Sequence, residues 1–220
     1  MSARPRWIVP VIMGVLVLAA LAFAIVATKS SESSGGGTAS APAATGAAAA
    51  PLSRGGFAGA ELPHAVPAPP LALTDQYGRA VSLASLRGQP VLVAFLYAHC
   101  GGPCTLIAQQ IRGALDELRH PVPVLIVSAD PAGDTPAAVR SFLAATSLSG
   151  RVYYLTGPAA ALRSVWRAYG VRPAAAGRAA FASRLTVVLI DPQGRERVLY
   201  GPEQLTPEAL AHDVGKLQSG

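Results

Sequence analysis

The chain has 220 residues, of which 51% are hydrophobic, and a formal net charge of +6. This length accommodates one ordinary domain with additional segments, and the apolar content is sufficient for a full core. The charge is modest and scattered, without a basic block or interleaved basic and aromatic residues, which argues against a nucleic-acid partner.

The N-terminal segment predicts a membrane helix. Residues 7–27 carry no charge and follow two basic residues, Arg4 and Arg6. Such a run can cross a hydrocarbon layer of about 30 Å, and the preceding charges place the N-terminus in the cytoplasm. A cleaved signal peptide is the alternative, although the run is longer than usual for one. We expect residues 1–28 to be a signal anchor in a bacterial cell membrane, with the rest of the chain on the extracytoplasmic side.

Residues 29–70 form a low-complexity segment rich in Ala, Gly, Ser and Pro. Its larger apolar residues, Leu52, Phe57 and Leu62, show no periodicity, so the segment buries too little surface to offset chain entropy. We expect a flexible tether without fixed structure, and a folded domain over residues 71–220.

The remaining residues predict alternating strands and helices. Strands are expected at 71–83 (a hairpin with its turn at 76–78), 91–97, 122–129, 152–155, 185–190 and 197–200. Helices are expected at 103–119, 135–146, 159–169 and 206–217. Two of these begin with Thr135-Pro136 and Thr206-Pro207, a capping residue before a proline at the first helical position. The order predicts an α/β, thioredoxin-like fold with a mixed central sheet flanked by helices.

The two cysteines, Cys100 and Cys104, stand between an apolar strand and a helix. Residues i and i+4 share one helix face with Cα atoms about 6 Å apart, which is within the range of a disulfide. Two thiolates there can close a disulfide or hold a soft cation such as Cu(I). Free cysteines are also often buried hydrophobes, but the Gly-Gly-Pro between the pair favours a redox or soft-metal site.

The position of the pair also predicts different roles for the two thiols. Cys100 comes at the start of the expected helix, where the positive end of the helix dipole favours its thiolate. We therefore expect Cys100 to be the attacking thiol and Cys104, one turn later, to be the resolving thiol. An extracytoplasmic setting favours a disulfide in the resting protein.

A series of short segments follows in a recognisable order. They are Asp75 with Gly78-Arg79, Leu86–Val93, Phe95–Cys104, Val127–Pro131 with Asp134–Pro136, Leu155–Gly157, Ala168–Val171 and Leu189–Gly194. Together they resemble the SCO/SenC family, membrane-tethered thioredoxin-fold proteins linked to copper delivery to cytochrome c oxidase. The resemblance implies Cu(I) as the metal of Cys100 and Cys104. It also implies a partner, which is a cytochrome c oxidase subunit or another thiol protein.

Two positions depart from the family pattern. The proline that usually follows the second cysteine is replaced by Thr105, and the proline here is Pro103. The family's copper-ligand His, eight residues before the Asp of the late turn at Asp191, is replaced by Ser183. The two cysteines still suit Cu(I), whereas Cu(II) loses a nitrogen ligand. His99 is the nearest substitute, but adjacent loop residues rarely face one ion, so we do not expect it to be a ligand.

Other polar and aromatic residues have simpler interpretations. Asp130 and Asp134 are expected to serve as turn and capping residues, and Trp166 and Tyr169 as core contacts. Two function classes remain. One is a copper-handling assembly factor for a respiratory oxidase, and the other is a membrane-anchored thiol–disulfide oxidoreductase without a copper role.

Overall fold

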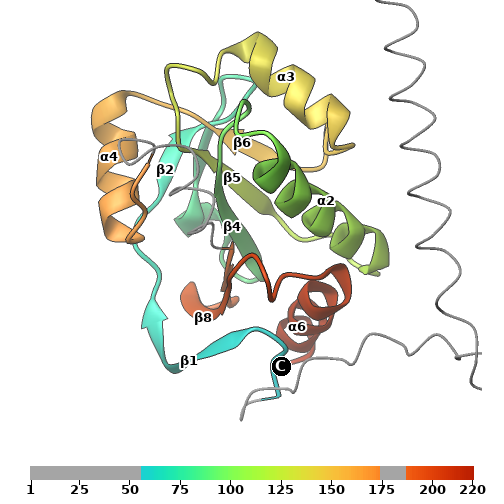
Figure 1. Cartoon of the computed structure of the whole chain (residues 1–220). Coiled ribbons are helices and arrows are strands. Elements are labelled where there is room, and N and C mark those ends of the chain that lie inside the picture. Colours follow the sequence, from blue (N-terminus) through green and yellow to red (C-terminus); the bar gives the residue numbers. More distant parts are fainter. Residues whose placement is uncertain (1–55, 174–186) are drawn as a thin grey trace, which may run out of the picture. The chain divides into compact units, whose positions relative to one another are not determined.

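A computed structural model of the chain describes residues 56–173 and 187–220 (Figure 1). The expected membrane helix, the tether up to residue 55 and Ser183 lie outside these residues. None of the helices in the described ranges combines the length and the hydrophobicity that a membrane span requires.

A mixed sheet with strand order β1-β8-β7-β4-β5-β6 lies at the centre of the described part. β4, β5 and β6 run parallel, whereas β7 is antiparallel to β4 and β8, and β1 is antiparallel to β8. The strands are β1 Ala60–Pro67, β4 Val91–Leu96, β5 Val124–Ser128, β6 Tyr153–Leu155, β7 Val187–Ile190 and β8 Arg195–Tyr200. A separate hairpin joins β2 (Ala72–Thr74) and β3 (Ala80–Ser82). The α/β class and the mixed sheet are therefore confirmed.

Helices cover both faces of this sheet (Figure 1). They are the 3₁₀ helix η1 Leu83–Leu86 and the α-helices α2 Gly102–Glu117, α3 Pro136–Ala145, α4 Ala159–Ala168 and α6 Pro207–Ser219. Leu92 and Leu96 of β4 belong to a core shared with α2, α3 and α6. Val93 and Phe95 belong to a second core shared with α4 and the β2–β3 hairpin. Because alternate residues face opposite sides of a sheet, β4 is buried on both faces, as its apolar sequence predicts.

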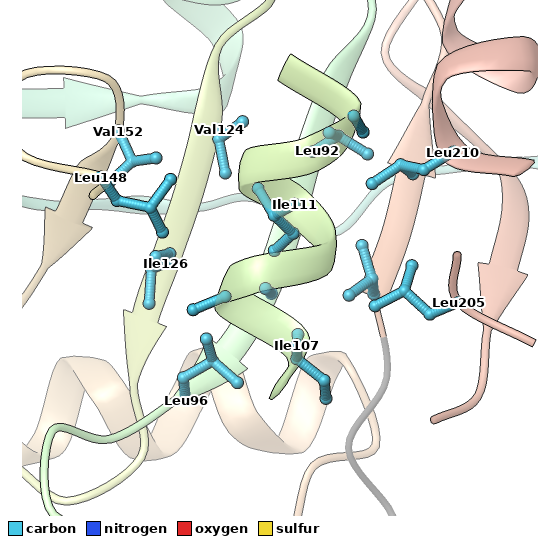
Figure 2. Close-up of a cluster of buried hydrophobic side chains, with 14 of the residues drawn as sticks. Leu92, Leu96, Ile107, Ile111, Val124, Ile126, Leu148, Val152, Leu205 and Leu210 are labelled. Carbon is cyan, nitrogen blue, oxygen red and sulfur yellow. The ribbon is translucent and has the colours of Figure 1, made fainter. Parts of the chain in front are cut away.

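α2 crosses the larger of the two cores (Figure 2). Ile107 and Ile111 are buried and lie in one cluster with β4, β5 and Leu210 of α6. Each fully buried side chain of this kind contributes about 1.5–3 kcal/mol relative to an exposed one. This packing fixes the helix on which Cys104 lies.

The expected helix starts are confirmed at two places. The Thr135 hydroxyl accepts a hydrogen bond from the Ala138 N–H and precedes Pro136 at the beginning of α3. Thr206 accepts in the same way from Ala209 at the beginning of α6. A hydroxyl acceptor supplies a partner to a backbone donor that has none within the helix.

The prediction that residues 29–70 lack fixed structure is wrong over β1, which pairs with β8 from Ala60 to Pro67. Edge pairing relies on backbone hydrogen bonds, so it does not need the periodic apolar pattern that we sought in the sequence. Phe57 is also buried, with the cations of Arg197 and Lys216 over its ring. The folded part therefore includes Phe57 and the eight residues of β1, which composition alone assigns to the tether.

Candidate dithiol site

The site is formed where β4 ends and α2 begins. All residues of β4 are buried, and the chain then continues through Tyr97, which is also buried, to the exposed His99. Gly101 precedes α2 with a φ of 79°, a conformation that glycine adopts without steric cost. Pro103 lies in the first turn, where its missing N–H costs no helical hydrogen bond.

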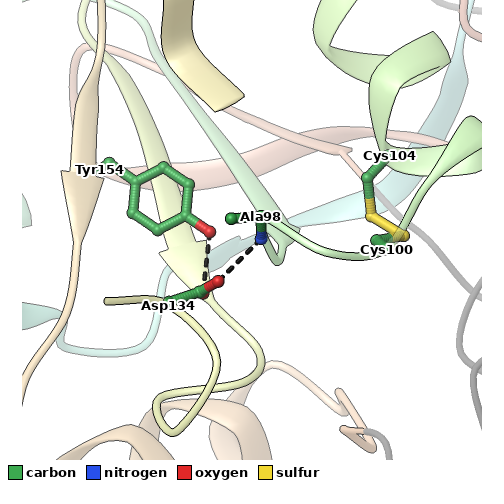
Figure 3. The surroundings of a disulfide bond; sticks show 5 residues. All are labelled: Ala98, Cys100, Cys104, Asp134 and Tyr154. Carbon is green, nitrogen blue, oxygen red and sulfur yellow. Dashed lines mark hydrogen bonds between the residues drawn. A yellow bond between two sulfur atoms is a disulfide. The ribbon is translucent and has the colours of Figure 1, made fainter. Parts of the chain in front are cut away.

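Cys100 and Cys104 form a disulfide with their Cα atoms 5.6 Å apart (Figure 3). The two residues differ strongly in access to solvent. Cys104 lies in α2, is completely buried, and belongs to the larger core, whereas Cys100 is only partly buried. The neighbours Gly101, Gly102 and Pro103 are exposed. A reaction partner can therefore reach Cys100 while Cys104 stays covered by protein.

The start of α2 favours a thiolate at Cys100. The first turn of α2 contains no acidic residue, and the N-terminal end of a helix dipole stabilises negative charge. When the disulfide is reduced, this position favours the Cys100 thiolate, which is the reactive form of the side chain.

The described residues supply two soft ligands for a metal at this point. Two thiolates from Cys100 and Cys104 suit Cu(I), which prefers sulfur donors. His99 is exposed. Over residues 56–173 and 187–220, no group of three His, Cys, Asp or Glu side chains is arranged to hold a metal. Ser183 lies outside the described ranges, so its relation to the cysteines stays a prediction.

Sequence reasoning missed the role of Asp134, which follows β5 and is buried (Figure 3). Its Oδ1 accepts a hydrogen bond from the Ala98 N–H at 2.7 Å. Its Oδ2 accepts from the hydroxyls of Ser128 at 2.6 Å and Tyr154 at 2.8 Å. The turn role expected for Asp130 is confirmed, since its carboxylate accepts from the Gly133 N–H. Asp134 instead joins the segment after β4, the last residue of β5 and Tyr154 within β6.

Burial raises the pKa of Asp134 above its usual range, although its three hydrogen bonds act in the opposite direction. The nearby carboxylate of Asp130 adds to the increase. One sequence signal could have indicated Asp134. It lies in the connection that follows a buried strand parallel to the cysteine strand, and the carboxyl ends of parallel strands meet at one edge of a sheet.

Trp166 extends this arrangement from α4. Its indole Nε1–H donates to the backbone oxygen of Ser128 at 2.9 Å, and Trp166 is buried in the second core. The expectation of a core contact is thus confirmed for Trp166. Tyr169 lies 5.3 Å from Phe95, centroid to centroid, and donates to the Pro69 oxygen. Both sides of the sheet therefore support the strand ends that position the cysteines.

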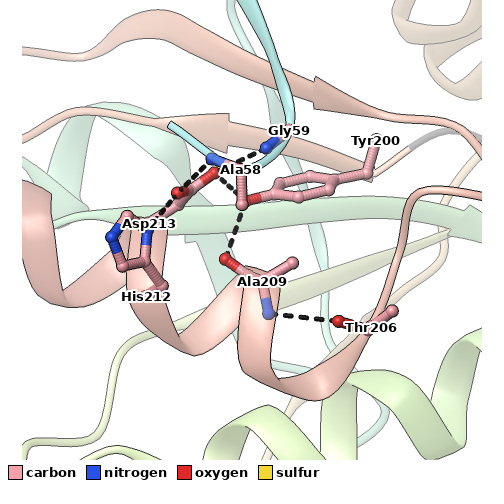
Figure 4. Close-up of polar contacts among 7 residues, drawn as sticks. All are labelled: Ala58, Gly59, Tyr200, Thr206, Ala209, His212 and Asp213. Carbon is pink, nitrogen blue, oxygen red and sulfur yellow. Dashed lines mark hydrogen bonds and ion pairs between the residues drawn. The ribbon is translucent and has the colours of Figure 1, made fainter. Parts of the chain in front are cut away.

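A second buried carboxylate, Asp213 of α6, holds the start of the domain (Figure 4). It accepts hydrogen bonds from the N–H groups of Ala58 at 2.8 Å and Gly59 at 3.0 Å, and from the Tyr200 hydroxyl. His212 is half-exposed and contacts the Asp213 Oδ1 through its Nδ1. A Cβ on Gly59 would lie 2.5 Å from Val198, so glycine permits this close approach.

A family model described as SCO1/SenC matches residues 61–219. The chain belongs to the SCO1/SenC family. The match starts within β1, which agrees with the structure in placing that strand in the domain. None of the curated proteins compared with the chain matches it significantly.

Solved structures of Sco proteins share this fold. BsSco is described as a member of the Sco family of cytochrome c oxidase assembly proteins with a disulfide switch. It is 21% identical to this chain with a TM-score of 0.61, and the match covers 71% of this chain and 96% of BsSco. ScoI of Bradyrhizobium japonicum, with copper bound, is 29% identical with a TM-score of 0.52, covering 70% and 99%. Apo Sco1 of Thermus thermophilus is 23% identical with a TM-score of 0.58, covering 73% and 96%. The thioredoxin-like Sco fold is thus confirmed for this SCO1/SenC chain.

Proposed function

We propose that this SCO1/SenC protein uses the Cys100–Cys104 pair to handle Cu(I) and to exchange disulfides during the assembly of cytochrome c oxidase. One observation carries the proposal. A disulfide joins an accessible cysteine to a buried one between β4 and α2. Family membership and the copper-bound ScoI structure, at 29% identity, support copper as the cargo.

The exchange reaction follows from the difference in exposure. In the reduced protein, the Cys100 thiolate attacks one sulfur of a partner disulfide, and the other partner sulfur leaves as a thiolate. Cys104 then attacks the Cys100 sulfur of the mixed disulfide, which releases the second partner thiolate and closes the Cys100–Cys104 bond. Two electrons pass to the partner, and its two sulfurs end as thiols. Reduction by a thiol donor restores the pair.

Copper handling uses the same two atoms. Reduced Cys100 and Cys104 each lose one proton and present two thiolates to Cu(I) as cargo. Oxidation to the disulfide removes both ligands, so the redox state of the pair decides whether the protein can carry copper. The same accessible surface around Gly101 and Gly102 then serves a partner that receives the ion or the electrons.

The replacement at Ser183 leads to a specific expectation. The reduced chain binds Cu(I) but binds Cu(II) poorly, because Cu(II) prefers nitrogen and oxygen donors. Ser183→His should strengthen Cu(II) binding and add a nitrogen ligand that is visible by electron paramagnetic resonance. His99→Ala should leave Cu(I) affinity almost unchanged. Loss of copper binding in His99→Ala would make His99 a ligand and contradict this assignment.

The proposal places the domain outside the cytoplasm, tethered to a bacterial membrane by residues 7–27. The uncharged length of this segment and the preceding Arg4 and Arg6 support the anchor. N-terminal sequencing of the membrane fraction tests it. A mature protein that begins near residue 25 and is recovered in the soluble fraction contradicts it.

The function in assembly is tested in cells that lack this chain. We expect the copper content and activity of cytochrome c oxidase in their membranes to fall, and to recover with the wild-type chain but not with Cys100→Ser. The matched control is Ser85→Ala, an exposed position on η1. Normal oxidase copper in the deletion strain contradicts the proposal.

A thiol–disulfide oxidoreductase without copper is the second candidate. It is favoured because the described part of the site offers only the two cysteines as ligands. Among the described residues, no three metal-ligating side chains form a cluster. In that case, the reduced chain reduces disulfides in a model peptide but shows no Cu(I) binding above that of Cys100→Ser.

A further inference from the structure

We infer that Asp134 is a positioning residue for the dithiol, which keeps the Cys100 segment in place when the disulfide opens. The inference rests on the proposed function, because it concerns the reduced form of the same cysteine pair. Asp134 does not touch either cysteine. It acts through the Ala98 N–H, two residues before Cys100.

The two cysteines depend differently on the disulfide for their position. Cys104 is held by α2, whose buried face packs into the larger core independently of the S–S bond. Cys100 lies in the short connection before α2, and its own N–H donates locally to the Tyr97 oxygen at 3.2 Å. The bond from Ala98 to Asp134 ties this connection to a part of the chain 36 residues away.

Asp134 is itself held firmly enough to act as a fixed point. Its other oxygen accepts from Ser128 at the end of β5 and from Tyr154 in β6. Ser128 is further held by the indole of Trp166. These partners come from β5, which pairs with β4, from β6, which pairs with β5, and from α4, so the position of the carboxylate is set by the sheet and not by the cysteine connection.

Loss of this contact should change the redox equilibrium in one direction. In the oxidised protein, the S–S bond restrains the connection with or without Asp134. In the reduced protein without Asp134, the connection gains conformational freedom, and closing the disulfide then costs more entropy. The equilibrium constant for disulfide formation should fall about tenfold, which raises the reduction potential by about 30 mV.

The test measures the equilibrium of the full-length chain in detergent with dithiothreitol. The protein dithiol and oxidised dithiothreitol give the protein disulfide and reduced dithiothreitol, so two electrons and two protons are transferred in balance. Asp134→Ala should lower this constant about tenfold. Asp134→Asn should stay within about threefold of wild type, because the amide oxygen still accepts from Ala98 and the amide N–H groups can donate to the two hydroxyls.

Asp213→Ala is the matched control. It also removes a buried carboxylate that accepts backbone N–H groups and a tyrosine hydroxyl, but its partners are Ala58, Gly59 and Tyr200. It should destabilise the fold and leave the redox constant unchanged. If Asp134→Ala does not fold, the double variant Ser128→Ala with Tyr154→Phe takes its place, with an expected fall of about threefold because the carboxylate loses its two orienting hydroxyls.

The outcomes separate the inference from the proposed function. A constant for Asp134→Ala within twofold of wild type, or an equal shift in Asp213→Ala, overturns the positioning role. In the double variant, an unchanged constant overturns it as well. If the wild-type pair does not equilibrate with dithiothreitol at all, the proposed redox function fails before Asp134 is tested.

Discussion

Asp75 in the β2–β3 turn and Asp134 behind the dithiol are both buried carboxylates, but their partners differ in kind. Asp75 accepts from the N–H groups of Tyr77 and Arg79 and pairs with the Arg79 guanidinium at 2.7 Å. Asp134 accepts from neutral groups of three segments, two of which are distant in the sequence. The first carboxylate stabilises a local turn, whereas the second holds together the part of the fold that presents Cys100.

The pKa values of the two groups move in opposite directions. Burial works against the Asp75 carboxylate, but the hydrogen bonds and charge of Arg79 and the Tyr77 N–H lower its pKa on balance. Burial dominates at Asp134 and raises its pKa. The cation and N–H groups of the local turn therefore favour the charged form of Asp75. The neutral donors around Asp134 do not compensate fully for the hydration that its carboxylate loses on burial.

The largest expected effect on stability is that of Asp134→Ala. It leaves a part-buried N–H and two buried hydroxyls without their acceptor, and each buried group left in this way costs about 1–3 kcal/mol. We expect the free energy of unfolding of the oxidised chain to fall by about 3 kcal/mol. Urea unfolding followed by circular dichroism measures it.

Asp75→Ala should have a smaller effect, although it removes as many hydrogen bonds and an ion pair as well. Tyr77 and Arg79 are exposed, so water replaces the lost acceptor. We expect a loss of about 1.5 kcal/mol in the same urea experiment. If Asp75→Ala lost as much unfolding free energy as Asp134→Ala, or more, the comparison would be contradicted. The carboxylate of the local turn would then contribute at least as much to stability as the carboxylate behind the dithiol.

Tyr154→Phe removes one of the three donors of Asp134 and keeps the ring that packs against Phe142. We expect a loss of about 1 kcal/mol, typical of one hydrogen bond. The redox constant should change less than twofold, since the bond from Ala98 to Asp134 remains. A shift as large as that of Asp134→Ala would mean that the hydroxyl, and not the Ala98 bond, positions Cys100.

The smallest effect is a difference in pH dependence. The folded-state pKa of Asp75 is depressed, so its contribution is present above the unfolded value near 3.9 and is lost as the pH falls through the folded pKa. The folded-state pKa of Asp134 is raised, so its contribution is complete below about 3.9 and is lost as the pH rises through the folded pKa.

Unfolding of wild type, Asp75→Asn and Asp134→Asn between pH 3 and 7 measures this difference. The advantage of wild type over Asp75→Asn should grow with pH, and its advantage over Asp134→Asn should shrink. Parallel slopes for the two variants contradict the assignment of opposite pKa shifts. Because the other titrating groups are common to all three proteins, their contributions cancel in the differences.

The same contrast explains what the sequence could predict. The Asp75 turn is local, and its pattern of an aspartate, a glycine three residues later and an arginine recurs at Asp191–Arg195 with the same backbone hydrogen bonds. The caps at Thr135 and Thr206 are local as well. Such features depend on neighbours within a few residues, which the sequence presents directly.

The missed features depend on contacts between distant segments. The partners of Asp134 are determined only when β4, β5 and β6 lie side by side. β1 was missed because its edge pairing and the contacts of Asp213 with Ala58 and Gly59 need the folded sheet and α6. For the dithiol, the spacing of Cys100 and Cys104 predicted the pair, but not which carboxylate supports it.

Cu(I) titration of the purified full-length chain, in competition with a chromogenic chelator, tests the central claim most directly. The fully reduced wild type should bind one Cu(I) per chain, and both the oxidised protein and Cys100→Ser should compete much more weakly, because two thiolates are needed to hold the ion. Equal Cu(I) binding by the reduced chain and Cys100→Ser, or by the reduced and oxidised chains, would contradict a redox-controlled copper site at Cys100 and Cys104.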